Sequence, residues 1–347
     1  MMARDSLKAR LSRAHGRRPR LPGPPGRARA GAAGRARVGA ASVFAGVVLL
    51  AGCGGSGPAS SPSGQISSAP ATTAVGRQPS PGSAPASTAA SAGPAAVPEP
   101  AHTVVVVMEN HSYAEIIGNP AAPFINTLAG RGALFTRSHA ITHPSQPNYL
   151  ALFSGSTQGV ADDSCPQEFT APNLGAGLIT AGKSFAGFAE DLPGTGSVVC
   201  SAGEYARKHV PWADFSTVPG SASRPFTSFP AAAFARLPDV SFVIPNLCHD
   251  MHDCSVAIGD AWLRGHLAGY ADWAMTHDSL LIVTWDEDDG SSGNHIATIF
   301  AGQQVRPGRY AEPITHYSVL ATIEAAYRLP RDGQAATATT ITNIWLP

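Results

Sequence analysis

Once its first part is set aside, the 347-residue sequence has no excess of basic side chains. It contains 24 Lys and Arg and 24 Asp and Glu, but eleven of the basic residues and only one acidic residue, Asp5, lie within residues 1–38. Residues 54–347 therefore hold 13 basic and 23 acidic residues. This balance argues against nucleic acid as a partner, because phosphate backbones bind to basic surfaces.

Eleven of the twelve histidines also lie after residue 53. They gain positive charge as the pH falls below about 6.5, so the net charge of this part then moves toward zero. Weaker repulsion of a phosphorylated substrate in acid favours activity at acid pH. Solvated surface histidines without any such role are the alternative interpretation.

The N-terminal apolar run is too short to cross a bilayer. It covers residues 43–51, whereas a spanning helix requires about 20 residues. The run follows a basic stretch and ends in Leu50-Ala51-Gly52-Cys53, which resembles the lipobox of bacterial lipoproteins. We therefore expect residues 1–52 to be a signal sequence with lipobox and Cys53 to be the lipid anchor. Ordinary secretory cleavage nearby, without use of Cys53, is the alternative.

Large apolar side chains and charges are both scarce in residues 53–100. Ser, Ala, Pro, Gly and Thr dominate, and Arg77 and Glu99 are the only charged residues. Such a composition cannot offset the chain entropy lost on folding, so we expect a disordered tether. The exported protein would then be lipid-anchored on the outer face of the cell membrane or released, with the lipid as its only membrane contact. Residues 101–347 have a length suited to one domain.

Cysteine is rare in that domain, with only four residues, and an even number in an exported protein predicts disulfides. Three pairings are possible. We favour Cys165 with Cys200 and Cys248 with Cys254, the second of which would close a short loop. The alternative is a zinc site formed by residues of that loop, Cys248, His249, His252 and Cys254; exported thiols, however, are usually oxidised.

Apolar strand-like runs alternate with helical patterns along the domain. The uninterrupted run Val104-Val105-Val106-Val107 is typical of a strand buried on both faces, as in a parallel sheet covered by helices. We expect strands at residues 103–108, 133–135, 184–189, 240–244, 280–285 and 296–300. We expect helices at residues 123–131, 148–153, 176–181, 255–276 and 317–327. This alternation predicts a three-layer α/β/α sandwich around a mostly parallel sheet.

Polar pairs follow two of the expected strands, Glu109-Asn110 after the first and Asp286-Glu287 after a later one. Carboxyl ends of parallel strands share one edge of a sheet, where sites form. Oxygen ligands of this kind suit one divalent cation, Mg²⁺, Ca²⁺ or Mn²⁺. Polar strand ends that lead into solvated turns are the alternative.

Ser145 is the candidate nucleophile. It lies between Pro144 and Pro147, at the expected start of a helix that closes at Gly155. Free backbone N–H groups and the positive end of the helix dipole attract a phosphoryl oxygen there and lower the cost of a serine alkoxide. A serine in this position is more often only a helix cap.

Four ordered segments carry a family resemblance: Glu109-Asn110-His111-Ser112-Tyr113, His143-Pro144-Ser145-Gln146-Pro147-Asn148-Tyr149, His249-Asp250-Met251-His252-Asp253 and Thr284-Trp285-Asp286-Glu287-Asp288-Asp289-Gly290. With them, residues from about His102 onward resemble the phosphoesterase family that joins bacterial phospholipases C to acid phosphatases. The resemblance implies an alkaline-phosphatase-like core and hydrolysis of phosphate monoesters by an acid phosphatase through a seryl nucleophile. Phosphatidylinositol 3-phosphate is one candidate substrate.

The resemblance also implies residue roles. One metal would be held by Glu109, Asn110, Ser145, Asp286 and Glu287. His249, Asp250 and His252 would bind phosphate oxygens or protonate the leaving group, and His295 is a further catalytic candidate. We expect His316, which opens a helix, to cap or pack rather than to act in the site, and residues 207–209 to meet an anionic head group or to form a solvated turn.

Two alternative functions remain open. The family's phospholipases C generally have Thr in place of Ser145, His-Gly-Gly in place of Asp288-Asp289-Gly290, and long C-terminal extensions; these differences favour the phosphatase branch. A phospholipase C that cleaves phospholipid diesters is the first alternative. A non-catalytic binding lipoprotein, which would keep the metal but not require Ser145, is the second.

Overall fold

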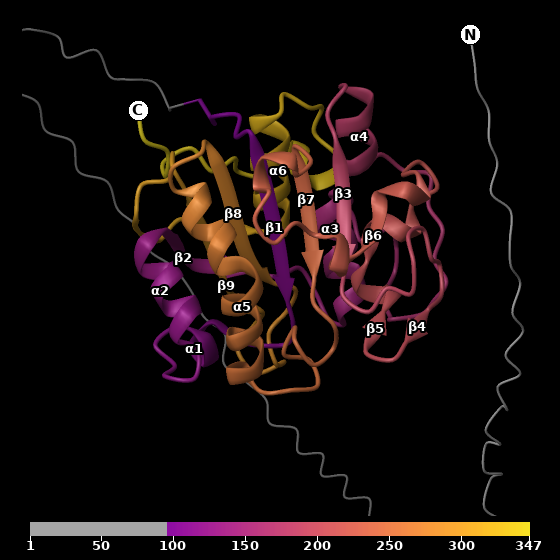
Figure 1. Cartoon of the computed structure of the whole chain (residues 1–347), viewed down its shortest axis with the longest axis horizontal. Coiled ribbons are helices and arrows are strands. Elements are labelled where there is room, and N and C mark those ends of the chain that lie inside the picture. Colours follow the sequence, from indigo (N-terminus) through magenta and orange to yellow (C-terminus); the bar gives the residue numbers. More distant parts are fainter. Residues whose placement is uncertain (1–95) are drawn as a thin grey trace, which may run out of the picture. The chain divides into compact units, whose positions relative to one another are not determined.

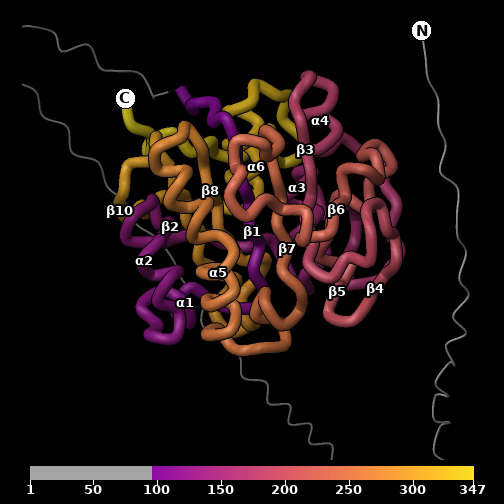
Figure 2. The backbone as a smooth tube through the Cα atoms, viewed as in Figure 1, coloured from indigo at the N-terminus to yellow at the C-terminus, as the bar shows by residue number. Residues whose placement is uncertain are grey.

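The computed structural model describes residues 96–347. The expected signal sequence, the lipobox with Cys53 and most of the expected tether lie outside the described residues. Figures 1 and 2 show the described part as a central sheet with helices packed on both faces. No helix among residues 96–347 has the length and apolar character needed to cross a membrane.

The central sheet has nine strands, in the order β10-β2-β9-β8-β1-β7-β3-β6, with β11 paired to β2. All its pairings are parallel except those of β9 with β2 and with β8. Its strands are β1 (His102–Met108), β2 (Ala133–His139), β3 (Phe185–Ala189), β6 (Ser223–Pro225), β7 (Val240–Ile244), β8 (Ser279–Trp285), β9 (His295–Gly302), β10 (Gly308–Tyr310) and β11 (Ile314–Thr315). A separate ribbon pairs β4 (Ser201–Ala202) with β5 (Tyr205–Ala206).

Helices cover both faces of this sheet. On one face lie α1 (Tyr113–Ile116), α2 (Pro123–Arg131) and α5 (Val256–Ala274), and on the other α3 (Ser145–Ser154), α4 (Leu174–Thr180) and α6 (His316–Ala326). Side chains of a strand alternate between the two faces of a sheet. Val104 and Val106 of β1 therefore pack in the core beneath α1, α2 and α5, and Val105 and Val107 pack in the core beneath α3, α4 and α6. The expected three-layer, mostly parallel α/β sandwich is confirmed.

Element boundaries differ from the expected ones by a few residues at several places. Helix α3 begins at Ser145 rather than at residue 148, and β2 continues to His139. The sequence did not indicate that β9 runs antiparallel, because a buried strand has the same composition in either direction. Irregular connections include two short 3₁₀ helices, η1 (Arg207–His209) and η2 (Pro211–Asp214).

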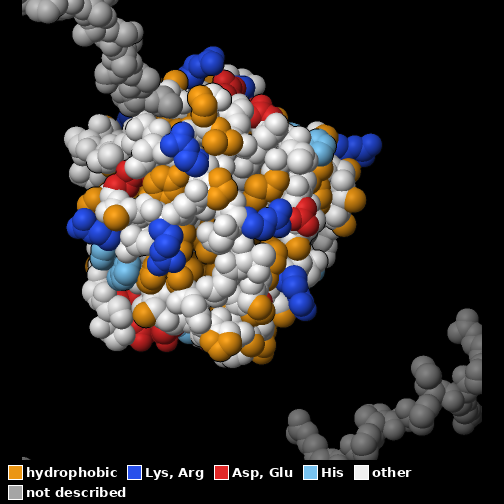
Figure 3. All heavy atoms as spheres, turned by 90° about the vertical axis from the view of Figure 1, so that its left-hand side faces the viewer, with side chains coloured by type: hydrophobic (Ala, Val, Ile, Leu, Met, Phe, Trp, Pro, Cys, Tyr) orange, Lys and Arg blue, Asp and Glu red, His pale blue; other side chains and the backbone are white. Residues whose placement is uncertain are grey.

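Figure 3 shows one side of the molecule, on which Lys and Arg side chains stand apart from one another between uncharged groups. Acidic side chains gather near the lower margin of this view, the side toward which β1 and β7 point in Figure 1. This face therefore presents no continuous basic surface of the kind that binds nucleic acid.

Candidate active site

Two neighbouring strands bring the first carboxylates of the site together. β1 and β8 are parallel and in register up to Met108 and Trp285, so that Glu109 and Asp286 leave the sheet side by side. The backbone N–H of Asn110, a residue with a φ of 53°, donates to Asp286 Oδ1 at 3.1 Å. Glu109 and Asp286 are 0% and 1% exposed, so burial at this edge is nearly complete.

Ser145 lies directly against these carboxylates. It is the first residue of α3 and only 2% of its surface is exposed. Its Oγ lies 3.1 Å from Glu109 Oε2 and 3.3 Å from Glu287 Oε1, so either carboxylate can accept its proton. The structure thus joins segments separated by 36 and 142 residues around one hydroxyl group.

The carboxylates are held in an unfavourable electrostatic environment. Burial, followed by the charges of Asp286 and Asp250, raises the pKa of Glu109 well above its ordinary value. Burial and the charge of Glu287 likewise raise the pKa of Asp286. Among the residues that the structure describes, the buried Asp286 Oδ2 has no hydrogen-bond partner. Glu109, Asp286 and Glu287 form a hard-oxygen donor set with an unsatisfied oxygen atom, and this set fits a divalent cation.

A second donor group adjoins the first. Glu109, His209 and His252 each offer a ligand atom, all within 4.8 Å of one another. His209 Nε2 lies 3.1 Å from Glu109 Oε1 without being directed at it for a hydrogen bond, and burial lowers the pKa of His209 well below its usual value. A neutral imidazole is the form that ligates metals. The expected set contained only oxygen ligands, whereas this group adds nitrogen.

Asp250 and His252 lie at the site, as the resemblance implies. Glu109 N–H donates to the Asp250 carbonyl oxygen at 2.9 Å, and Asp250 Oδ2 lies 3.3 Å from His209 Nδ1. His252 Nδ1 lies 2.7 Å from Asp253 Oδ1. The loop therefore turns residues 250 and 252 toward Glu109.

The structure does not place His249 and His295 with Ser145. His249 Nδ1 lies 2.9 Å from Glu190 Oε2, and its ring lies beside Trp262. His295 Nε2 lies 3.0 Å from the Thr136 carbonyl oxygen, and its ring stacks on two others, those of Tyr113 and His139. Within residues 96–347 neither makes a polar contact with the Ser145 cluster. Side chains of adjacent loop residues point in different directions. His249 therefore faces away from Ser145 although it precedes Asp250 directly in the sequence.

Two further side chains of the site, those of Tyr149 and His143, were given no role from the sequence. Tyr149 OH donates to Glu109 Oε1 at 2.5 Å, and His143 Nδ1 lies 2.8 Å from Glu287 Oε2. Lys208, for which we expected contact with an anionic head group or a solvated turn, has its Nζ 3.5 Å from His252 Nε2. The solvated turn at residues 207–209 is wrong, because Arg207 and His209 are 6% and 1% exposed. Tyr149 occupies the helix turn after Ser145 and lies, with His143, in a segment that carries the family resemblance, and these were the available signals for it.

Asp288 organises the loop that follows β8. Its carboxylate accepts the backbone N–H groups of Gly290, Ser292 and Asn294 at 2.7, 2.8 and 2.9 Å. Together with Asn110, His143, Glu287, Asp289 and Gly290 it lines an open pocket of about 360 Å³. Asp288 therefore shapes the entrance to the site.

His316 supports the site from behind. Its Nε2 lies 2.7 Å from the Asp286 carbonyl oxygen, and burial lowers its pKa to about 4. The neutral ring donates this hydrogen bond and orients the backbone of a candidate metal ligand. Its packing role is as expected, and its contact with Asp286 is an addition.

Similarity to known proteins identifies the family of this chain. Residues 119–330 match the model of the phosphoesterase family. The chain belongs to the phosphoesterase family. It is therefore a hydrolase of phosphate esters, and the expected family membership is confirmed.

Two phosphatases and one solved structure are similar to this chain. The phosphatidylinositol-3-phosphatase of Mycobacterium tuberculosis is 60% identical over 247 residues, which cover 71% of this chain and 83% of that protein. An acid phosphatase of Aspergillus fumigatus is 31% identical over 227 residues, 60% of this chain, and the chain spans about half (51%) of its length. A solved structure from the alkaline phosphatase superfamily of Vibrio parahaemolyticus has a TM-score of 0.50 at 12% identity, over 70% of this chain and 71% of that chain, which shows a shared fold.

Two disulfides tie the loops of this phosphoesterase. The structure pairs Cys165 with Cys200 and Cys248 with Cys254, the pairing that the sequence favours. The alternative zinc site is excluded, since its two cysteines are bonded to each other. The second disulfide closes the loop that carries Asp250 and His252.

Proposed function

We propose that this protein is an exported, metal-dependent acid phosphatase that hydrolyses phosphate monoesters through Ser145. The observation that carries the proposal is the buried Ser145 hydroxyl at the start of α3, 3.1 Å from Glu109 and 3.3 Å from Glu287. The start of the helix places the positive end of its dipole beside the attacked anion, and the neighbouring carboxylates accept the hydroxyl proton.

In the first step, Ser145 Oγ attacks phosphorus in line with the ester bond. The Oγ–P bond forms, the bond from phosphorus to the leaving oxygen breaks, and the serine proton passes to Glu287 or Glu109. A ring nitrogen of His252 lies within 4.8 Å of a Glu109 carboxylate oxygen, and Lys208 Nζ lies 3.5 Å from His252 Nε2, so both can serve as donors to phosphoryl oxygens or to the leaving oxygen. Burial lowers the pKa of Lys208, but the hydrogen bond to Asp163 and the negative charge of Asp163 raise this pKa by more. Lys208 therefore stays positively charged.

In the second step, a water molecule attacks phosphorus and the bond to Ser145 Oγ breaks, which returns the free serine and inorganic phosphate. Glu109, Asn110, Ser145, Asp286 and Glu287 would hold the divalent cation, with His209 as a further ligand beside Glu109. When bound, the cation supplies Lewis-acid stabilisation of the charge that develops on oxygen. Asp250 and His316 keep Glu109, His209 and Asp286 in place.

Phosphatidylinositol 3-phosphate is the proposed substrate. The 60% identity to the mycobacterial phosphatidylinositol-3-phosphatase supports it. The open pocket at Asn110, His143 and Glu287 allows access by a head group that extends from a membrane surface.

The proposed localisation outside the cytoplasm rests on the disulfides and on the expected N-terminal signal sequence. Disulfides persist in oxidising compartments, which supports export. The signal sequence at residues 1–52, the lipid on Cys53 and the tether to residue 100 remain predictions, as does the assignment of residues 101–347 to the phosphoesterase domain.

The test is phosphate release from p-nitrophenyl phosphate and from vesicles containing phosphatidylinositol 3-phosphate, at pH 4 to 9, with and without chelator. We expect Ser145→Ala to lower kcat by at least about a thousandfold, because the attacking oxygen is removed. Ser154→Ala is the matched control, since it removes a buried hydroxyl at the other end of α3, where it bonds to Leu150.

Three results would contradict the proposal. Full activity of Ser145→Ala would exclude the seryl mechanism, and full activity after chelation would exclude the metal. Cleavage of a choline phospholipid diester without monoester hydrolysis would favour phospholipase C instead.

A further inference from the structure

Residue 146, the neighbour of the proposed nucleophile, is held by two loops at once. Gln146 is 1% exposed and is the second residue of α3. Its backbone N–H and its side-chain amide each donate to a different carboxylate, Asp163 and Asp214. Fixing both the backbone and the side chain of Gln146 restricts the position of Ser145, because one peptide unit joins them.

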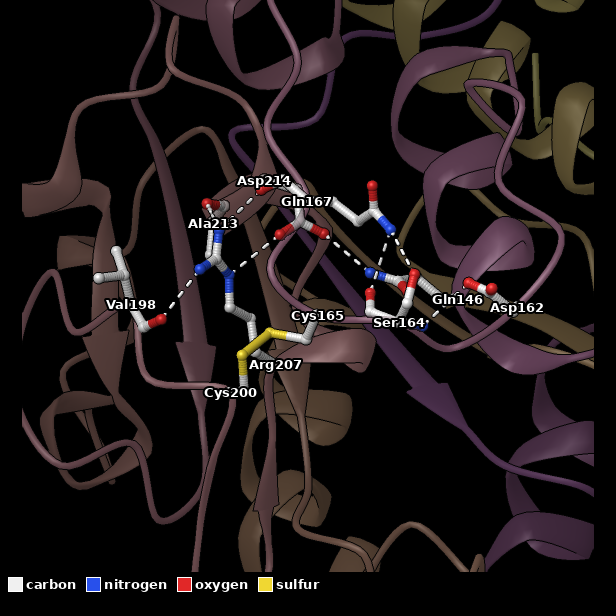
Figure 4. Close-up of a disulfide and its surroundings, with 10 residues drawn as sticks. All are labelled: Gln146, Asp162, Ser164, Cys165, Gln167, Val198, Cys200, Arg207, Ala213 and Asp214. Carbon is white, nitrogen blue, oxygen red and sulfur yellow. Dashed lines mark hydrogen bonds and ion pairs between the residues drawn. A yellow bond between two sulfur atoms is a disulfide. The ribbon is translucent and has the colours of Figure 1, made fainter.

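The side-chain contact leads to a buried ion pair. Gln146 Nε2 donates to Asp214 Oδ2 at 3.3 Å, and Arg207 Nε donates to Asp214 Oδ1 at 3.0 Å. Asp214 is 1% and Arg207 6% exposed. The remaining guanidinium donors reach three carbonyl oxygens at 2.9, 3.0 and 2.9 Å, those of Val198, Gln167 and Ala213. Figure 4 shows Arg207 between these groups.

The backbone contact leads to the proposed phosphate-binding side chains. Asp163 Oδ1 accepts the Gln146 N–H at 3.0 Å, and Asp163 Oδ2 accepts Lys208 Nζ at 2.8 Å. Lys208 follows Arg207 directly in the chain and lies 3.5 Å from His252 Nε2. The same two loops therefore orient both Ser145 and Lys208.

The Cys165–Cys200 disulfide joins these loops. Cys165 lies between Asp163 and Gln167 in sequence, and Cys200 lies two residues after Val198. The backbone N–H of Arg207 donates to the carbonyl oxygen of Cys200 at 2.9 Å. The covalent bond thus connects two of the three segments whose carbonyl groups hold the guanidinium (Figure 4).

We propose that Gln146, Asp214 and Arg207 are positioning residues for Ser145 and that the Cys165–Cys200 disulfide is required for turnover through them. This rests on Ser145 being the nucleophile, as proposed above. The planar guanidinium group of Arg207 makes four hydrogen bonds in fixed directions. A Lys side chain cannot reproduce these four directions. Misplacement of a reacting atom by about 1 Å lowers the rate by up to about a hundredfold.

The kinetic test compares Arg207→Lys, Asp214→Asn and the double variant Cys165→Ser/Cys200→Ser with the wild type on p-nitrophenyl phosphate, at a temperature well below unfolding. We expect kcat to fall by at least about tenfold while KM changes by less than about threefold. Arg331→Lys is the matched control: Arg331 also lies near a buried acid, with its Nη1 3.8 Å from Glu324 Oε2, but outside the site, and its kcat should remain unchanged.

Hydrogen exchange of the peptide that contains residues 145–149 gives a readout independent of activity. We expect faster exchange in the disulfide double variant and in Asp214→Asn, and unchanged exchange in Arg331→Lys, even if Ser145 has another role. A wild-type enzyme without phosphatase activity would overturn the proposed function. Unaltered exchange, or a kcat that stays at the wild-type value in folded Arg207→Lys, would overturn the positioning proposal.

Discussion

Glu109 shows how burial prepares a carboxylate for function. It is fully buried, accepts a hydrogen bond from Tyr149, and lies beside Asp286 and a neutral His209; burial and the neighbouring carboxylates raise its pKa more than the charge of Lys208 lowers it. Buried acids outside functional sites are normally paired with bases. A cation and a phosphoryl group together would complete the charge balance that the protein leaves open here.

Glu324 of α6 is a buried acid without such a role. Burial raises its pKa from 4.5 to about 8, although Asp332 N–H donates to its Oε1 at 2.9 Å. The folded state therefore binds more protons than the unfolded state between these two pH values. Its contribution to stability is complete below about pH 4.5 and is lost as the pH rises through about 8.

We expect Glu324→Gln to remove this pH dependence. The variant should gain stability over the wild type as the pH rises: the difference between their free energies of unfolding should be on the order of 3 kcal/mol more favourable to the variant at pH 8.5 than at pH 5. Urea unfolding at both pH values measures the difference, and substitution of the exposed Glu168 by Gln is the control. An equal effect of Glu324→Gln at both pH values would show that Glu324 does not titrate in this range.

At the scale of elements, β3 and η2 are in unusually close contact. Trp212 of η2 is 1% exposed and covers Gly187 of β3, where an added Cβ would lie 2.0 to 2.4 Å from atoms of the indole ring. Only glycine allows this approach, because any side chain would displace the ring. η2 also carries Asp214, so the packing of β3 supports the segment that holds Gln146.

Gly187→Ala should therefore destabilise the protein by about 1 to 3 kcal/mol through overpacking. Gly265→Ala is the matched control, because Gly265 is exposed on α5 and an added Cβ meets no atom within 4 Å. There we expect a gain of about 0.5 to 1 kcal/mol from better helix propensity. Thermal unfolding of both variants measures these shifts, and equal midpoints would contradict the close contact.

At the scale of the whole molecule, the site lies at one edge of the sheet and is built from distant segments of the chain. Glu109, Ser145, His209, His252 and Asp286 come together only in the folded state. A ligand that binds this cluster therefore stabilises the entire fold rather than one element.

Divalent cations should raise the unfolding midpoint, and chelator should lower it. A cation at one hundred times its dissociation constant stabilises the folded state by about 2.7 kcal/mol. Thermal scans with Mg²⁺, Ca²⁺, Mn²⁺ and Zn²⁺ measure the shift and rank the metals. Asp286→Asn should respond less than the wild type, and an identical response in both would place the cation elsewhere.

The sequence by itself determined the layers, the strand ends that carry carboxylates and the helix that begins near Ser145. Periodicity marks buried strands and helices, and parallel strands bring Glu109 and Asp286 to the same edge. The spacing of the cysteines also favoured the observed disulfides. These features depend on local pattern and on chain direction, both of which can be read from residue order.

Only the tertiary structure decided which loop residues reach the site. His209, Lys208 and Tyr149 join Glu109 and His252 there, while His249 turns to Glu190 and His295 to Tyr113. Irregular loops have no periodicity, so the direction of each side chain follows from packing, disulfide closure and hydrogen bonds between segments far apart in sequence. The positioning of Ser145 through Gln146 belongs to this second class.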